Sequence, residues 1–289
     1  MNAKAFSPGH ISGFFEPVYY QNDFSRSGSR GAGVSINLGA LSKVTILDSS
    51  RQNFDVFING NRSPAPVTKL ALKYLIGENK LNILVKTRLD VPMGQGFGVS
   101  GAGALSSCLA AAKLCGLSSS DALRAAHFAE VNLKTGLGDV VSSFLGGFEI
   151  RKTPGLPPWG FIEHIAGKYD IVICVIGSKI DTKKILCDRK SINKIIEHGR
   201  FCTKKILEKP SVENFFNLSY IFAKKTGLAT KKILAAIDSC KNYGNASMCM
   251  LGNSIFAIGK TNELARILSS FGKVYICNVD DTGARIIKS

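Results

Sequence analysis

Five glycines lie within ten residues, at Gly94, Gly96, Gly98, Gly101 and Gly103. The small and apolar residues that follow, up to position 115, predict a buried helix. A glycine-rich loop that leads into a helix exposes backbone N–H groups at the positive end of the helix dipole, and both features attract phosphate oxygens. This stretch therefore predicts a phosphate-binding loop.

The loop differs from the commoner glycine-rich nucleotide motifs. Residues 96–101 fit G-x-G-x-x-G, but a dinucleotide-binding fold requires a strand after the helix and an acidic residue about twenty positions further on. Here Ser118 to Asp121 has the pattern of a helix N-cap instead. The loop also lacks the G-K-[ST] of a Walker motif, and the chain lacks the HRD and DFG motifs of protein kinases. A glycine-rich turn packed under a core helix is the alternative.

Three polar residues follow on the next predicted helix and just beyond it. His127 and Glu130 are three positions apart on a helix expected from the Ser118 cap to about Lys134, so they share a face. Glu130 could equally pair with Lys134, and His127, among alanines, has the pattern of a hydrogen-bonded core histidine. Asp139 follows a glycine and precedes an apolar helical run, which by itself favours an N-cap. The residues alone leave both kinds of role open.

The composition indicates a globular and strongly basic chain. It has 289 residues, of which 45% are hydrophobic, and a formal charge of +16 with a pI near 9.6. The lysine pairs of the second half lie on helix-like segments without interleaved aromatic residues, so solvated helix faces explain them better than a nucleic-acid surface does. The same positive field favours anionic small substrates, ATP included. We expect no nucleic-acid partner, and an RNA-binding module is a distant alternative.

No membrane or secretion signal stands out. No apolar run approaches the length of a membrane span, and the N-terminal residues lack a signal-peptide core. Eight scattered cysteines, none in a C-x-x-C pattern, indicate neither a disulfide framework nor a zinc site. We expect a cytoplasmic protein without a membrane partner, and the sequence leaves a homodimer open.

In the first half of the chain, predicted strands come before predicted helices. Ser7 to His10 is expected to end the first strand, Gly28 to Gly33 to form a glycine-rich turn, and Asn59-Gly60 to close a hairpin. Strands are expected over 3–6, 34–38, 44–47, 54–58 and 81–87, and a helix over 67–75. This order indicates an α+β layer architecture.

In the second half, a Pro-rich segment at 154–159 follows a strand expected over 148–151 and is the best linker candidate. Beyond it we expect strands over 171–176, 246–251, 254–258 and 274–279 and helices over roughly 180–206, 211–226, 229–242 and 261–271. The pattern suggests a split βαβ domain. We therefore expect one domain over 1–155 and another over 156–289.

Four segments resemble the motifs of the GHMP kinases, a family that includes galactokinase and the homoserine, mevalonate and phosphomevalonate kinases. Pro92 to Gly101 resembles their P-x-x-x-G-L-G-S-S-A motif, and Thr135 to Gly147 resembles S-G-x-D-x-x-x-S-x-x-G-G. Pro8 to Glu16 resembles P-G-[KR]-x-x-x-x-G-E-H, with His10 where the family usually has lysine or arginine. Ser247 to Asn253 stands where a third motif would be, with fewer glycines than usual.

The resemblance covers essentially the whole chain and is strongest to the archaeal pantoate kinase branch. It implies a two-domain α+β fold, with a ribosomal-S5-domain-2-like N-terminal domain and a ferredoxin-like βαβ C-terminal domain. It also implies an ATP- and Mg²⁺-dependent kinase that phosphorylates the primary hydroxyl of pantoate on the route to coenzyme A. Another small hydroxy acid or alcohol, of the mevalonate, homoserine or shikimate type, is the alternative acceptor.

The resemblance also implies roles for individual residues. Ser100 and Glu130 are expected to ligate Mg²⁺, a hard cation that prefers oxygen. Asp139 stands at the acidic position beside the acceptor hydroxyl, as a base or as an orienting charge. The residues expected to bind the nucleotide phosphates are Pro92, Gly94, Gly96, Phe97, Gly98, Val99, Ser100, Gly101 and Ala102.

The carboxylate of the acceptor requires a cationic partner near these motifs. A guanidinium suits bidentate capture of a carboxylate, and two arginines qualify, Arg151 and Arg30. We favour Arg151, which follows the acidic segment, and expect further acceptor contacts from His127, Ser29 and His10. In the alternative, Arg151 lies on an exposed strand face.

Overall fold

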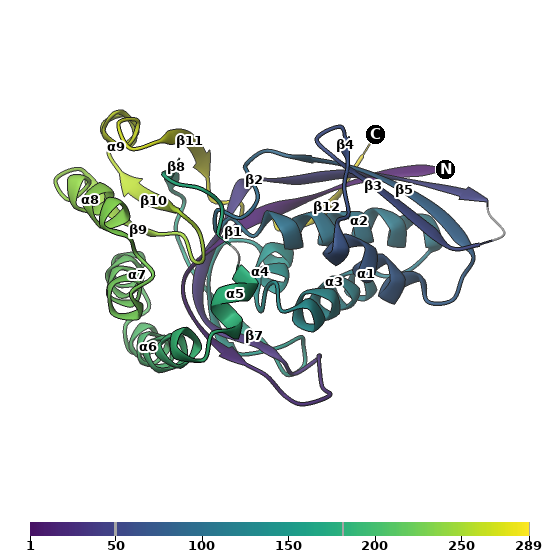
Figure 1. The fold of residues 1–289 in the computed structure, drawn as a ribbon, viewed down its shortest axis with the longest axis horizontal. Helices are drawn as coiled ribbons and strands as arrows, with labels where there is room; N and C mark the ends of the chain where they lie inside the picture. The colour runs from purple at the N-terminus through teal and green to yellow at the C-terminus, as the bar shows by residue number, and fades with distance from the viewer. Residues whose placement is uncertain (49–50, 181, 289) are drawn as a thin grey trace.

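The computed structural model describes residues 1–48, 51–180 and 182–288, which form two lobes (Figure 1). The larger lobe contains an eight-stranded sheet. Six of its strands follow the order β12-β1-β2-β5-β3-β4, and the other two, β6 and β7, are joined to this row because β6 pairs with β2. β3 and β5 pair in parallel, whereas the other neighbours are antiparallel. The strands are β1 (Asn2–Val18), β2 (Gly28–Asp48), β3 (Asn53–Ile58), β4 (Asn61–Arg62), β5 (Leu81–Leu89), β6 (Phe148–Thr153), β7 (Phe161–Ile165) and β12 (Arg285–Ile287).

β1 and β2 are longer than predicted and pair along most of their length. The break predicted at Ser7 to His10 is wrong, because these residues lie inside β1, where a register shift between Pro8 and Gly9 accommodates the proline. The turn predicted over 28–33 is also wrong, since these residues begin β2 opposite residues 12–18 of β1. The two strands run between the lobes and carry His10 and its neighbours to their junction.

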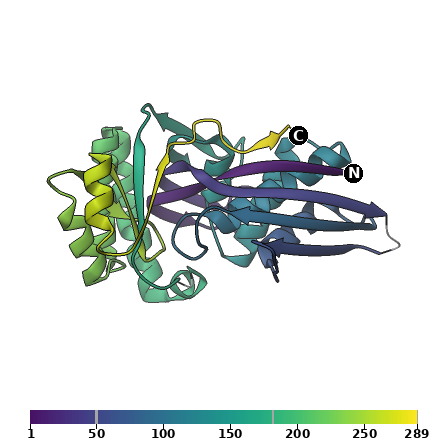
Figure 2. The same cartoon turned by 90° about the horizontal axis from the view of Figure 1, so that it is seen from above.

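Helices pack under one face of the large sheet (Figures 1 and 2). The other face is uncovered over β3, β4, β5 and the neighbouring parts of β1 and β2, whereas helices of the smaller lobe contact β1 and β2 near the junction of the lobes. Most of α2 is buried, as its apolar residues on all sides require. α3 begins with the predicted capping box of Ser118 and Asp121. The Asn59-Gly60 hairpin between β3 and β4 is also confirmed. The helices are α1 (Pro66–Ile76), α2 (Val99–Cys115), α3 (Ser119–Leu133) and α4 (Asp139–Leu145).

The Pro-rich segment does not link two domains. Residues 154–160 form the turn between β6 and β7, which pair as a hairpin of the large sheet, so the linker prediction is wrong. β12, near the end of the chain, also pairs with β1. Residues on both sides of position 155 therefore build the larger lobe, and the division into 1–155 and 156–289 stays a prediction.

The smaller lobe has an antiparallel sheet with the order β11-β8-β10-β9, which is 4-1-3-2 in chain order, as in a ferredoxin-like sheet. The ring of Phe14, from β1, packs against Phe215 of this lobe, so the two cores are continuous. The predicted α+β fold is confirmed. The strands of the smaller lobe are β8 (Asp170–Val175), β9 (Gly244–Met248), β10 (Ser254–Gly259) and β11 (Lys273–Asn278). Its helices are α5 (Thr182–Cys187), α6 (Arg189–Glu208), α7 (Val212–Thr226), α8 (Lys231–Ser239) and α9 (Thr261–Leu268).

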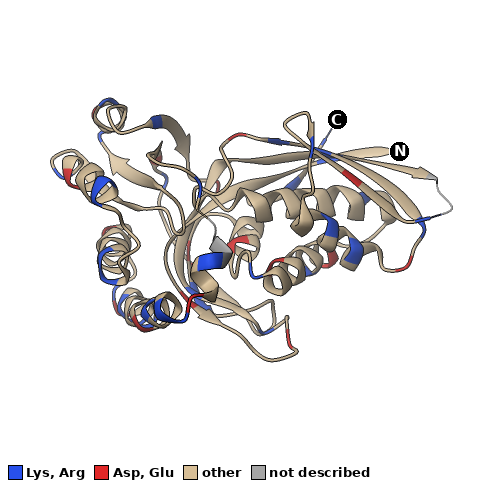
Figure 3. Ribbon diagram, viewed as in Figure 1, with Lys and Arg blue, Asp and Glu red and all other residues tan. Residues whose placement is uncertain are grey.

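The helix predicted over 180–206 is divided between α5 and α6, and residue 181 within it lies outside the described residues. The Asp188 side chain caps α6. Lysines and arginines are spread over many elements, including the helices of the smaller lobe (Figure 3). Among the described residues, no helix combines the length and apolar character needed to cross a membrane.

Candidate active site

The glycine-rich loop leads into α2 with its backbone N–H groups unused. Gly98 is the helix N-cap, with a left-handed φ of 59°, and no side chain caps the helix. None of the N–H groups of residues 94–101 donates a hydrogen bond to another residue that the structure describes. The loop is held by a carbonyl instead, because the N–H of His10 donates to the oxygen of Phe97 at 2.9 Å. The free N–H groups at a helix N-terminus form a site for an anion.

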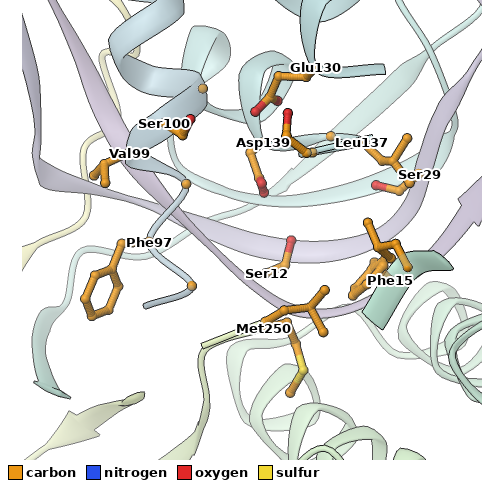
Figure 4. Close-up of a pocket in the computed structure, with 18 of the residues that line it drawn as sticks. Ser12, Phe15, Ser29, Phe97, Val99, Ser100, Glu130, Leu137, Asp139 and Met250 are labelled. Atoms are coloured by element: carbon orange, nitrogen blue, oxygen red, sulfur yellow. The ribbon is translucent and has the colours of Figure 1, made fainter. Parts of the chain in front are cut away.

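A cavity opens at this loop, between the two lobes (Figure 4). Ser12, Phe15 and Leu137 of the larger lobe complete its wall, together with Leu186 and Met250 of the smaller lobe. The predicted residues that line it are Ser29, Gly94, Gly96, Phe97, Gly98, Val99, Ser100, Gly101, Glu130 and Asp139. Those that do not line it are His10, Arg30, Pro92, Ala102, His127 and Arg151.

Two of the predicted phosphate contacts need correction. Pro92 is exposed on the approach to the loop and lies outside the cavity. Ala102 is fully buried, and its N–H already donates to the carbonyl of Gly98 at 3.0 Å. The available donors therefore end before Ala102, where the hydrogen bonding of the helix begins.

Glu130 is a buried carboxylate without a protein partner. The residue is 3% exposed, and its side chain forms no hydrogen bond or ion pair with another described residue, Lys134 included. Burial and the charge of Asp139 raise the pKa of Glu130 well above its ordinary range, although the charge of His10 acts in the opposite direction. A bound cation would stabilise the ionised form of this side chain.

Ser100 and Glu130 lie on either side of Gly101. Ser100 is exposed at the start of α2, and a Cβ added to Gly101 would lie 2.7 Å from Oε1 of Glu130. A hydroxyl and an unpaired carboxylate fit Mg²⁺, which usually keeps water and substrate phosphate oxygens in its other positions. Within residues 1–48, 51–180 and 182–288, no group of three or more His, Cys, Asp or Glu residues could hold a metal ion by itself.

Asp139 is the first residue of α4 and its carboxylate does not cap the helix. Gly138 is the N-cap, and Oδ1 of Asp139 accepts a 2.7 Å hydrogen bond from Nδ1 of His10. Burial by itself would raise the pKa of Asp139, but the hydrogen bond and charge of His10 and the charge of Arg151 lower it. The side chain is 29% exposed and faces the cavity as a carboxylate (Figure 4).

His10 is fully buried between two carboxylates, which corrects its predicted contact with the acceptor. Nδ1 donates to Asp139, and Nε2 lies 3.0 Å from Oε1 of Glu149. Ionised carboxylates only accept, so the imidazole must be protonated on both nitrogens. Burial lowers the pKa of His10, but the charge of Glu149 and the hydrogen bonds of Asp139 and Glu149 raise it to about 9. Sequence analysis missed Glu149; a charged residue between the apolar Phe148 and Ile150 was the available signal.

Arg151 is buried next to Glu149, so its interpretation as an exposed strand residue is wrong. The side chain is 3% exposed, with one terminal nitrogen paired to Glu149 and the other donating to Ser12 at 3.2 Å. Its Nε has no partner among the described residues. A Cβ added to Gly138 would lie 2.9 Å from this Nε and 2.5 Å from Oγ of Ser29. One free guanidinium N–H therefore lies close to the cavity wall at Ser29.

His127 and Arg30 do not reach the cavity. His127 is buried, and its Nε2 lies 3.0 Å from the carbonyl oxygens of Phe24 and Ser27. Burial lowers the pKa of His127 despite these bonds, which makes it a neutral donor that holds the turn before Ser29. The Nε of Arg30 donates to the carbonyl of Lys152. The direct acceptor contacts predicted for both residues are not formed by this geometry.

A second hollow, of about 250 Å³, adjoins the cavity. It shares Val99, Ser100 and Thr135 with the cavity, so the two spaces meet at the start of α2. Its remaining walls are mostly apolar and come from β3, β5, the loop after β5 and the start of α1 with the segment before it; they include Pro64, Pro66, Val67, Leu89 and Met93. An apolar slot beside an anion site suits a ligand with a flat ring and a charged tail.

Comparison with known proteins gives consistent matches. The family model for the GHMP kinases N terminal domain matches residues 66–147, which include the loop, Glu130 and Asp139. Pantoate kinase of Methanocaldococcus jannaschii is 37% identical over 95% of this chain and 99% of its own length. Pantoate kinase of Methanospirillum hungatei is 34% identical, over 98% and 96%. A solved structure described as a phosphotransferase related to the CoA biosynthesis pathway has a TM-score of 0.89 and 28% identity, and covers 99% of this chain and 98% of that one.

Proposed function

This chain belongs to the pantoate kinase family of the GHMP kinases, and from that premise we propose that it transfers the γ-phosphoryl group of ATP to the primary hydroxyl of pantoate. The observation that carries the proposal is the meeting of three kinds of group at one cavity. These are the free N–H groups of residues 94–101, the oxygen donors of Ser100 and Glu130, and the carboxylate of Asp139. Phosphoryl transfer depends mainly on positioning and on neutralising charge, and this set of groups provides both.

We assign the phosphates of ATP to the free N–H groups and its adenosine to the adjoining apolar hollow. The hollow opens at Ser100, so one ligand could occupy both spaces. Mg²⁺ held by Ser100 and Glu130 would offset the negative charge of the transferring phosphoryl group. The raised pKa of Glu130 supports this role, because a carboxylate left without a cation in this position resists ionisation.

Asp139 would orient the acceptor hydroxyl and take its proton. The hydroxyl oxygen forms a bond to the γ-phosphorus while the bond from that phosphorus to ADP breaks, and the proton passes to the carboxylate. His10 lowers the pKa of Asp139, which makes the carboxylate a weak base. A weak base suffices because the transition state is loose and the proton can leave late. We therefore expect Asp139 to contribute mainly by position and charge.

Ser29, which lines the cavity, and the free Nε of Arg151, which is buried just outside it, are our candidates for the carboxylate of the acceptor, which would have to shift the wall at Gly138 to contact both. They flank Gly138, next to Asp139, so a small hydroxy acid could place its carboxylate there and its hydroxyl at Asp139. A buried, unpartnered guanidinium N–H is costly until an anion accepts it. His127 would act indirectly, since it holds the Ser27 carbonyl in the turn that leads to Ser29.

The test is a kinase assay of the purified full chain with Mg²⁺-ATP and, separately, pantoate, mevalonate, homoserine, shikimate and galactose. ADP release with pantoate, and with none of the other four acceptors, supports the proposal. Release with a different acceptor would replace the substrate, and no release with any of them would contradict the kinase assignment. Asp139→Asn is the catalytic control, with an expected loss in kcat on the order of 10²-fold and an unchanged Tm. Activity within a few-fold of the wild type would remove Asp139 from the mechanism.

A further inference from the structure

Three lysines on the uncovered face of the large sheet lie directly opposite one another. Lys4 of β1 pairs with Lys43 of β2, and Lys43 pairs with Lys86 of β5, so the three form one row across adjacent strands. All three are exposed, whereas the next residues along β2 and β5, Val44 and Val85, are buried in the core on the other face. Figure 2 shows the strands of this face with no helix in front of them.

This row of like charges lacks compensation within the chain. Residues directly opposite in a sheet have Cβ atoms about 5 Å apart, and like charges at that spacing destabilise it. None of the three lysine side chains forms a hydrogen bond or an ion pair with a residue that the structure describes. Two acidic side chains lie beyond the row, and each is already paired, Asp55 with Arg62 and Asp90 with Arg88. The uncompensated charge requires an explanation other than stability.

The row forms one side of a hollow of about 690 Å³. Arg88 lines the same hollow, because it lies two residues after Lys86 and therefore on the same face of β5, but its charge is paired with Asp90. Leu41, Leu84 and Phe57 supply apolar surface, and Phe57 lies directly opposite Lys86 on β3. A volume of this size is in the usual range for small-molecule sites, and it combines several cations with an aromatic ring.

We propose that this hollow binds a small anion with several phosphate groups, of the nucleoside polyphosphate class. The three lysines would pair with the phosphates, and Phe57 would pack against the base. A second copy of the chain is a poor occupant, because a symmetric contact would bring the lysines together. A long polynucleotide fits less well than a small anion, since Asp55 on β3 and Asp90 after β5 limit the cationic surface on that side of the row.

The substitution Lys43→Gln tests the proposal, because it removes the central charge of the row and leaves the cavity at Asp139 unchanged. Lys194→Gln, at an exposed position of α6, is the matched control. In low salt and without ligand, we expect Lys43→Gln to raise the Tm above that of the wild type, since the repulsion is relieved, and Lys194→Gln to leave it unchanged. An unchanged or lower Tm for Lys43→Gln would mean that the row carries no stored repulsion and would count against the proposal.

Binding is measured by calorimetry of the full chain with tripolyphosphate. The wild type and Lys194→Gln should show two binding events, one of them at the glycine-rich loop. Lys43→Gln should weaken one event by about tenfold or more and leave kcat and the KM for ATP unchanged. Two unchanged events in Lys43→Gln would overturn the proposal. Tighter binding of a single-stranded RNA octamer than of tripolyphosphate, at equal phosphate concentration, would overturn it in favour of a polynucleotide.

Discussion

His10 and Asp139 are joined by a 2.7 Å hydrogen bond, although they come from a strand and a helix that are 129 positions apart in the chain. The other nitrogen of His10 is held by Glu149, whose carboxylate also pairs with Arg151. Two cations and two carboxylates thus form one connected network, of which Asp139 is the member that lines the cavity. We infer that His10 is a positioning residue, which fixes the carboxylate of Asp139 and keeps it ionised.

The first prediction concerns His10→Gln. The amide can still donate one hydrogen bond, but the positive charge beside Asp139 is lost. We expect kcat to fall by about 10²-fold, because a small misplacement of a reacting group costs about that much, and the KM for ATP to change little. Steady-state kinetics with each substrate varied would check this. An equal rise in both KM values with an unchanged kcat would rule out a positioning role.

The second prediction is a pH dependence of stability. His10 has an ordinary pKa of 6.5 when unfolded and a pKa of about 9 when folded, so the folded state binds this proton more tightly. The stabilisation is complete below about pH 6.5 and is lost as the pH rises through about 9, with a size on the order of 3 kcal/mol. Urea unfolding of the wild type and His10→Gln at about pH 6 and about pH 10 should show their difference shrinking at the higher pH. A constant difference would mean that the imidazole is not charged in the fold.

Local patterns in the sequence predicted much of the fold. The capping box at Ser118 and Asp121 and the Asn59-Gly60 hairpin depend on neighbouring residues, and both are confirmed. The errors concern β1 and β2, where Pro8 and the glycines of 28–33 suggested interruptions. In a strand pair, a bulge accommodates a proline and glycines allow close approach, so residues that usually end a strand are retained within it. That outcome depends on the partner strand and is not visible locally.

The candidate site also combines features that depend on neighbouring residues with features that depend on distant ones. Ser100, Glu130 and Asp139 each belong to a local motif, and the structure brings all three to one cavity. The network behind them is non-local, since His10 and Glu149 are 139 positions apart and meet only because β2 pairs with both β1 and β6. Sequence spacing therefore predicted these three residues of the cavity wall but not the charged residues behind them.

The third prediction concerns Glu130→Gln. If this carboxylate is a metal ligand, the variant should need roughly tenfold or more Mg²⁺ for half-maximal rate, because a neutral amide is a weaker ligand for a hard cation. Its Tm without metal should be unchanged or higher, since a buried unpaired carboxylate is removed. Titration of Mg²⁺ at saturating ATP and a thermal scan would check both.

The exposed substitution Glu213→Gln on α7 is the matched control for Glu130→Gln and should leave both measurements unchanged. A normal Mg²⁺ requirement combined with a lower Tm would show that Glu130 has a structural role instead. In the wild type, the raised pKa of Glu130 also predicts that the Mg²⁺ requirement increases as the pH falls, because protons then compete with the metal for the carboxylate.

The last prediction concerns Gly138→Ala. The φ of Gly138 is −166°, which any residue adopts, so the backbone itself tolerates alanine. The new Cβ would lie 2.5 Å from Oγ of Ser29 and 2.9 Å from Nε of Arg151, and must displace the two groups that we assign to the carboxylate of the acceptor. We therefore expect the KM for pantoate to rise about tenfold or more, with the KM for ATP nearly unchanged, because only the acceptor loses a charge-assisted hydrogen bond.

Kinetics with each substrate varied at saturating levels of the other would measure both constants. A normal KM for pantoate would exclude this wall as the carboxylate site, and an equal rise for both substrates, with a lower Tm, would indicate a general distortion of α4.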